Sequence, residues 1–151
     1  MSKTILGVDT GASGALAFYD AKELMVYDMP VVKRNKTSRI EPQEFIRILK
    51  TNQPIDHCYI EQVNAFGMGA TGAYNFGWNC GVVEALIASQ NIPFTYVTPQ
   101  VWKKAMSCPK DKDAARMRAT QLLPMFADNW PLKKHDGRAE AALIALYGYN
   151  L

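Results

Sequence analysis

Two short apolar runs that each end in a carboxylate constrain the fold of this chain most. Ile5-Leu6-Gly7-Val8 runs into Asp9, and Cys58-Tyr59-Ile60 runs into Glu61. Short apolar runs of this kind are typical of buried strands. A buried carboxylate needs a partner or a metal ion. Although the two runs are far apart in sequence, we expect their acidic ends to converge at one edge of an α/β sheet. An Asx turn is the alternative for Asp9 alone.

Two further acids lie one helical turn apart in the last predicted helix. Asp136 and Glu140 are four residues apart, which places both on one helical face. Taken singly, Asp136 is explained as an N-cap and Glu140 as a first-turn acid that complements the helix dipole. A capping box, however, has its Glu three residues after the cap, and two acids so placed repel each other unless a cation lies between them. The four acids together predict a site for Mg²⁺, with Mn²⁺ as a substitute.

The order of the predicted elements indicates one α/β domain over residues 1–151. Strands are expected at residues 4–9, 15–19, 23–29, 57–63 and 92–97. Helices are expected at residues 42–50, 73–90, 99–106, 112–123 and 137–148, the first of them burying Phe45, Ile46 and Leu49. The basic stretch 33–39 is expected to be a loop. Three antiparallel strands followed by alternating helices and strands predict a mixed five-stranded sheet with helices on both faces, an order that resembles the RNase H-like fold.

Composition narrows the class of protein but does not identify a function. The chain is 48% hydrophobic and 21% charged, with a net charge of +3, so net charge alone does not suggest nucleic acid. Basic residues are nevertheless clustered, and either they contact phosphate or they form ordinary solvated faces; the candidates are Lys33, Arg34, Lys104, Lys110, Lys112 and Arg116. The three cysteines have no zinc spacing and fit a reduced cytosolic protein. No run suits a signal peptide or a membrane span.

The predicted helix at 73–90 is apolar on two sides, so it is either deeply buried or shared with a partner. One face carries Phe76, Cys80, Val83 and Ile87, and the other carries Tyr74, Trp78, Val82 and Ala85. A Gly-rich loop, residues 64–72, connects Glu61 to this helix and contains Phe66. An aromatic residue on such a loop either stacks on an unpaired base or anchors the loop in the core.

Four motifs in this order resemble the RuvC-like Holliday junction resolvases, especially the short phage-type members. The motifs are Gly7-Val8-Asp9-Thr10-Gly11, Ile60-Glu61-Gln62-Val63, the segment from Tyr96 to Lys104, and the segment from His135 to Leu143. The resemblance implies a cytoplasmic, homodimeric endonuclease, in the host cytoplasm if phage-encoded. It would cut opposing strands of a four-way DNA junction with two Mg²⁺ ions about 4 Å apart, held by Asp9, Glu61, Asp136 and Glu140.

The resemblance also assigns roles outside the acidic residues. Phe66 would probe the junction, and the face formed by Tyr74, Trp78, Val82 and Ala85 would be the dimer interface. Bacterial members of the family usually place two Asp three residues apart on the last helix, whereas Asp136 and Glu140 are four apart, so which of them is the main ligand stays open. The alternatives are an ATP-binding domain of the actin or sugar-kinase type, a related nuclease acting on RNA or on branched DNA in general, and a non-catalytic junction-binding protein.

Overall fold

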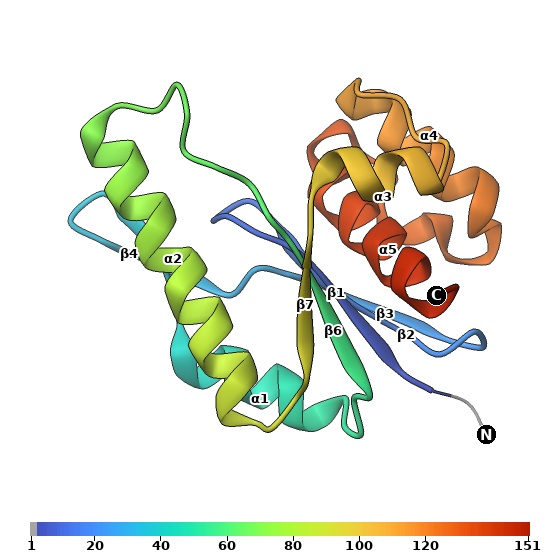
Figure 1. Ribbon diagram of the computed structural model, residues 1–151, viewed down its shortest axis with the longest axis horizontal. Helices are drawn as coiled ribbons and strands as arrows, with labels where there is room; N and C mark the ends of the chain where they lie inside the picture. The colour runs from blue at the N-terminus through green and yellow to red at the C-terminus, as the bar shows by residue number, and fades with distance from the viewer. Residues whose placement is uncertain (1–2) are drawn as a thin grey trace.

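Five of the seven strands in the described part of the chain form one mixed sheet in the order β3-β2-β1-β6-β7 (Figure 1). In this computed structural model, which describes residues 3–151 and every side chain among them except that of Lys112, β1 (Ile5–Asp9), β2 (Ala15–Tyr19) and β3 (Leu24–Asp28) are antiparallel neighbours. β6 (His57–Glu61) pairs parallel to β1, and β7 (Phe94–Val97) pairs parallel to β6. The predicted mixed five-stranded sheet is confirmed.

Side-chain alternation along the strands decides which helical layer each residue meets. Leu6 and Val8 of β1 belong to the core under α1 (Pro42–Thr51) and α2 (Ala70–Ser89). The intervening Gly7 faces α5 (Asp136–Tyr149) on the opposite side. α3 (Pro99–Ala105) and α4 (Lys112–Leu122) complete this second layer, and Figure 1 shows the sheet between the two groups of helices. Helices therefore cover both faces, as predicted.

Small residues let α5 lie directly on the sheet. A Cβ added to Gly7 would come within 2.4 Å of the backbone of Ala141 and Ala145, and one added to Gly148 would meet the ring of Tyr59. Because a larger side chain would not fit at either position, the two glycines allow α5 to lie close to the sheet. This close approach helps to fix the position of α5, whose first turns carry Asp136 and Glu140.

The basic stretch 33–39 is not a loop, and that prediction is wrong. It forms most of a β-hairpin, β4 (Val31–Arg34) paired with β5 (Thr37–Ile40). The two connecting residues, Asn35 and Lys36, have φ of 50° and 65°, as the two-residue turns that suit hairpins require. The prediction failed because the exposed hairpin lacks the apolar alternation of a strand.

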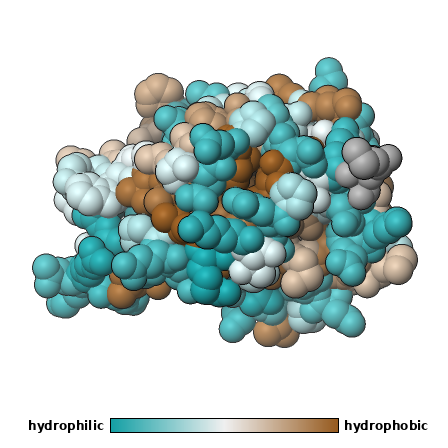
Figure 2. Space-filling view, turned by 90° about the horizontal axis from the view of Figure 1, so that it is seen from below, coloured by the Kyte–Doolittle hydropathy of each residue, from teal (hydrophilic) through white to brown (hydrophobic). Residues whose placement is uncertain are grey.

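Smaller differences concern the helices. In α1 the buried residues are Phe45, Ile48 and Leu49, whereas Ile46, predicted to be buried, is half-buried. Two 3-10 helices, Pro124–Asn129 and Lys133–His135, connect α4 to α5 and were not predicted. Within the part of the chain described, none of the helices has the length and apolar character needed to cross a membrane. Figure 2 shows the end of the molecule seen from below, where hydrophilic residues cover most of the surface.

Candidate metal centre

Strand register brings the first two acids together. Asp9 and Glu61 are the last residues of β1 and β6, and these strands run parallel with Val8 opposite Ile60. Both carboxylates therefore leave the sheet at the same edge. Alternation turns both toward α5, because Val8 and Ile60 face the other layer. The predicted convergence of the two apolar runs is observed.

Three of the four predicted acids form a tight group. One carboxylate oxygen from each of Asp9, Glu61 and Glu140 lies within 4.8 Å of the other two. Asp9 is 9% and Glu61 is 6% exposed. Asp136 is outside this group but close enough for its charge to act on Asp9. It is the first residue of α5, and the N-cap is His135, so Asp136 is not the cap residue.

The electrostatics of the group favour a bound cation. Burial raises the pKa of Asp9 well above its usual range, and the charges of Glu140, Glu61 and Asp136 raise it further, with a hydrogen bond to Glu61 acting in the same direction. A carboxylate that is buried among other carboxylates is unfavourable unless a positive charge compensates it. Oxygen donors alone, with no His or Cys in the group, are the donor set that suits Mg²⁺ or Mn²⁺.

Neighbouring side chains from α3 hold two of these carboxylates. The indole Nε1 of Trp102 donates a hydrogen bond of 2.7 Å to Oε2 of Glu61. Lys103 Nζ lies 3.8 Å from Oε1 of Glu140. The sequence analysis singled out Lys104 rather than Lys103. The available signal was that α3 begins at the carboxyl end of β7, the same sheet edge as the acids.

Glycine at position 137 lets the start of α5 reach Asp9. A Cβ there would lie 2.7 Å from the carbonyl oxygen of Ser13 and 3.2 Å from Oδ2 of Asp9. The next residue, Arg138, donates two hydrogen bonds to Asp28 at the end of β3, of 2.7 and 2.8 Å. Close approach and this two-pronged ion pair together fix the helix end that carries Asp136 and Glu140.

The basic candidates have different surroundings. Lys104 and Lys110 line a hollow of about 480 Å³, together with Gln100 and Lys103. Lys33 and Arg34 are exposed on β4. Arg116 instead donates hydrogen bonds to the carbonyls of Trp130 and Pro131, so its guanidinium already supports the fold. Lys112 begins α4, but its side chain lies outside the described residues.

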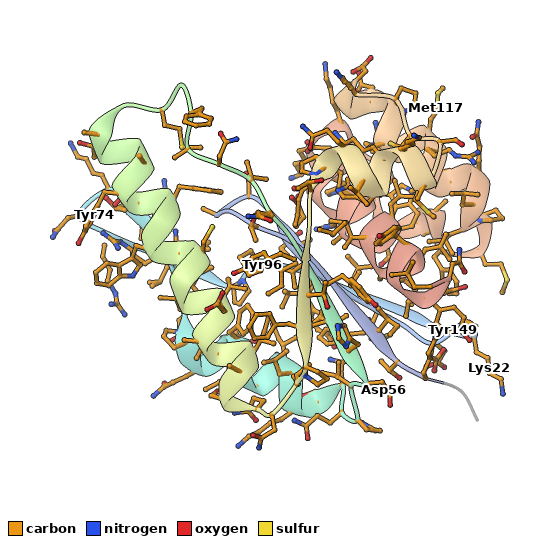
Figure 3. All side chains as sticks on the ribbon, in the orientation of Figure 1. Lys22, Asp56, Tyr74, Tyr96, Met117 and Tyr149 are labelled. Carbon is orange, nitrogen blue, oxygen red and sulfur yellow. The ribbon has the colours of Figure 1, made fainter. Side chains whose placement is uncertain are left out.

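The aromatic candidates are exposed. Phe66, at the turn of the loop between β6 and α2, is 90% exposed, and it is therefore not a core anchor. On α2, Tyr74 is 61% and Trp78 is 50% exposed, and Figure 3 shows Tyr74 on the side of α2 away from the sheet. Val82 is half-buried and Ala85 is exposed. The opposite face of α2 buries Val83 and Ile87 against the sheet.

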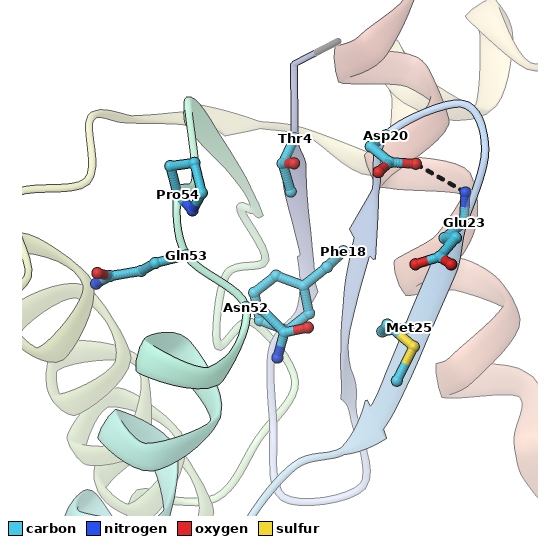
Figure 4. A pocket seen from close by; sticks show the side chains of 8 residues that line it. All are labelled: Thr4, Phe18, Asp20, Glu23, Met25, Asn52, Gln53 and Pro54. Carbon is cyan, nitrogen blue, oxygen red and sulfur yellow. Dashed lines mark hydrogen bonds between the residues drawn. The ribbon is translucent and has the colours of Figure 1, made fainter.

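A separate hollow of about 270 Å³ lies at the other end of β1, where Thr4 precedes the strand (Figure 4). Asp20 and Glu23 line it, and Oδ1 of Asp20 accepts a hydrogen bond of 2.7 Å from the backbone N–H of Glu23. This bond closes the β2–β3 turn. Since Asp9 is at the opposite end of β1, the hollow is remote from the carboxylate group, and the Asp20 side chain serves the turn.

The sheet order, with carboxylates at the ends of two parallel neighbours and on the last helix, defines an RNase H-like fold. RuvC of Thermus thermophilus in complex with a Holliday junction substrate has this fold, with a TM-score of 0.67 and 17% identity over 97% of this chain and 93% of that chain. A second Thermus thermophilus RuvC structure matches with a TM-score of 0.58 and 18% identity, again over 97% of this chain and 93% of that chain. No protein-family model and no curated protein matches the sequence. The resemblance to RuvC predicted from the motifs is confirmed in the fold.

Proposed function

We propose that this protein is a divalent-metal-dependent endonuclease that cuts four-way and other branched DNA as a homodimer. The observation that carries the proposal is the group formed by Asp9, Glu61 and Glu140, whose carboxylate oxygens lie within 4.8 Å of one another. It is supported by the fold of a RuvC whose solved structure contains a Holliday junction substrate.

The residues present fit a divalent ion. Asp9, Glu61 and Glu140 would hold it, and Asp136, one helical turn from Glu140, would complete the set for a second ion. Such ions, when bound, polarise the phosphodiester and activate water for hydrolysis. The chain itself contributes orientation, because Trp102 holds Glu61 through the 2.7 Å hydrogen bond. It also contributes charge, because Lys103 lies at the rim of the group beside Glu140.

Other exposed groups suit branched DNA. Lys104 and Lys110 surround a hollow next to Lys103, where cations can contact phosphates. Lys33 and Arg34 lie on the exposed hairpin. Phe66, at 90% exposure, can insert its ring between bases where a junction is already unstacked. Binding would thus combine sequence-independent phosphate contacts with one aromatic probe.

The homodimer is proposed from the outer face of α2. Gly77 and Gly81 lie inside this helix, yet a Cβ at either would meet nothing within 4 Å. Interior glycines destabilise a helix by roughly 0.5–1 kcal/mol each relative to alanine, and no contact within the described part of the subunit requires them. A second α2 packed closely against this face would require them, and Tyr74 and Trp78 would flank the contact. A two-fold dimer presents two sites to a two-fold junction.

The test uses a labelled four-way junction, a Y-fork and linear duplex, each with Mg²⁺, Mn²⁺ or EDTA. We expect paired nicks in the junction with either metal and none with EDTA or with Asp9→Asn. Equal cutting of the fork would make the protein a general branch nuclease. Absence of cutting in all three DNAs would overturn the proposal and direct attention to RNA or to nucleotide binding.

A further inference from the structure

A hollow of about 320 Å³ lies beside the metal centre and has no part in the function proposed so far. Three segments that are distant in sequence form its walls: the β1–β2 turn, the tip of the β4–β5 hairpin and the first turns of α2. The residues that matter for its chemistry are Gly11, Lys36, Met68, Gly72, Asn75 and Phe76.

The hollow is close to the carboxylates but on the other side of the β1–β2 turn. Gly11 is two residues after Asp9, so their Cα atoms are at most roughly 7 Å apart. The carboxylates face α5, whereas the hollow opens between the turn and α2. A nucleic acid strand laid across this end of the sheet would therefore meet the carboxylates with one phosphate and the hollow with a neighbouring nucleotide.

The hairpin wall is held firmly on α2. Asn79, 4% exposed, accepts a hydrogen bond of 3.1 Å from the backbone N–H of Ile40 and donates one of 3.0 Å to the carbonyl of Ser38. Arg39 donates a hydrogen bond of 3.1 Å to Oδ1 of Asn75, and its guanidinium carbon lies 4.3 Å from the ring centroid of Trp78. Since a buried amide satisfies two backbone groups of β5, the hollow is built into the fold.

The walls combine apolar and polar groups. Phe76 is half-buried and Met68 is 43% exposed, so both offer apolar surface. The side-chain oxygen of Asn75 accepts the hydrogen bond from Arg39. Its amide nitrogen donates no hydrogen bond to any described residue and can therefore donate to a ligand. Lys36 is exposed at the hairpin turn. A nucleobase can stack its flat faces on apolar side chains and hydrogen-bond its polar edge to amide and ammonium groups. The walls of the hollow offer both kinds of group.

We propose that this hollow binds an unpaired nucleobase of the substrate, one or two nucleotides from the scissile phosphate; the inference rests on the function proposed above. The loop that carries Phe66 also carries Met68, which lines the hollow. A ring of Phe66 inserted into the junction takes the stacking place of a base. The displaced base then has an apolar surface two residues away in the same loop.

Gly72→Leu tests the proposal, because this residue lines the hollow and a Cβ there would meet only the Cβ of Met68, at 3.8 Å. The larger side chain fills the hollow, and replacing an interior glycine favours the helix. Gly72→Ala, which adds one carbon, is the smaller step in the same series. Thermal unfolding and light scattering show whether both variants keep the fold and mass of the wild type.

The substrates are four-way junctions with one abasic position, scanned three nucleotides to either side of each cut. In single-turnover cleavage by the wild type, we expect one position at which the abasic site slows cutting by about 10-fold, the order of one stacked base. Gly72→Leu should cut the intact junction about 10-fold more slowly and be indifferent to the base at that position. Gly72→Ala fills less of the hollow, so its cleavage rate should lie between those of the wild type and Gly72→Leu.

Three results would overturn the proposal in distinguishable ways. If the wild type cuts junctions and Gly72→Leu cuts them equally fast with the same abasic profile, the hollow binds no base while the nuclease function stands. If a neutral phosphate analogue slows cleavage and an abasic site does not, Lys36 contacts the phosphate backbone and the hollow is not a base-binding site. If the wild type cuts no branched DNA, both proposals fail together.

Discussion

At the scale of single residues, the arrangement of the carboxylates is unfavourable for stability when no cation compensates their charge. Asp9, Glu61 and Glu140 share one small volume, and burial and mutual repulsion raise the pKa of Asp9. Strain of this kind at a site is retained where function needs it. Removing a charge from the group should therefore raise the free energy of unfolding of the metal-free protein and abolish its proposed nuclease activity.

Asp9→Asn tests this trade-off directly. The amide keeps the shape of the side chain but removes the most repelled charge, so we expect cleavage of the junction to be lost. In EDTA the free energy of unfolding should rise, because burial and the neighbouring carboxylates disfavour the ionised form of Asp9 and raise its pKa. Urea denaturation and the cleavage assay measure the two effects. Lower stability together with retained cleavage would remove Asp9 from the metal site.

The pH dependence of this stability difference has a definite sign. Because the pKa of Asp9 is higher in the folded than in the unfolded chain, the folded chain binds this proton more tightly. Its contribution to stability is complete below the unfolded value of roughly 4 and is lost as pH rises through the folded pKa. We expect Asp9→Asn to gain on the wild type as pH rises, in EDTA. A constant difference from pH 4 to 8 would contradict the raised pKa.

Trp102 is a positioning residue whose indole N–H orients Glu61. Trp102→Phe keeps most of the buried ring and removes that donor, and we expect Mn²⁺ affinity by calorimetry to fall by about 10-fold, the usual effect of losing an outer partner of a metal ligand. Trp130→Phe is the control, because Trp130 is also buried and donates to Oγ1 of Thr120, away from the acids. An equal loss in both variants would make the effect one of stability.

At the scale of elements, the sequence predicts most where periodicity is strong. The sheet strands and the five helices were predicted near their observed bounds. Four acids were predicted to meet; Asp9, Glu61 and Glu140 do so, whereas Asp136 lies outside their group. The β4–β5 hairpin was missed because its stability comes from Asn79 on α2, a tertiary contact without a local pattern. Lys103 was missed because the direction of a lysine on a seven-residue helix depends on how α3 packs.

The start of α5 depends on one glycine that periodicity does not explain. Gly137→Ala would favour a helix in isolation, but its Cβ would lie 2.7 Å from the backbone oxygen of Ser13. We expect the helix end to shift away from β1, with a loss of 1–3 kcal/mol of stability, typical of overpacking, and weaker Mn²⁺ binding. Gly72→Ala, the same change on α2 with ordinary contact distances, should stabilise or leave the protein unchanged. Equal Tm values for both variants would refute the packing argument.

At the scale of the whole molecule, the outer face of α2 and the candidate metal centre would serve the same function only if two chains associate. Within the described subunit, Gly77 and Gly81 serve no contact, while Tyr74 and Trp78 expose large apolar surface beside them. Large exposed apolar patches mark interaction sites. Two metal centres related by a two-fold axis would face the two opposing strands of a four-way junction, which gives a physical reason for symmetric cutting.

Gly81→Arg tests this arrangement without disturbing the subunit, since the added side chain enters open space and arginine is a good helix former. A charged side chain inside a close helix–helix contact should give monomers by light scattering. Monomers should retain Mn²⁺ binding, because the carboxylates come from one chain, and should lose paired nicks. The exposed substitution Gln43→Arg on α1 is the control and should stay dimeric. An unchanged mass for Gly81→Arg would place the interface elsewhere, and a monomeric wild type that still nicks both strands would remove the need for one.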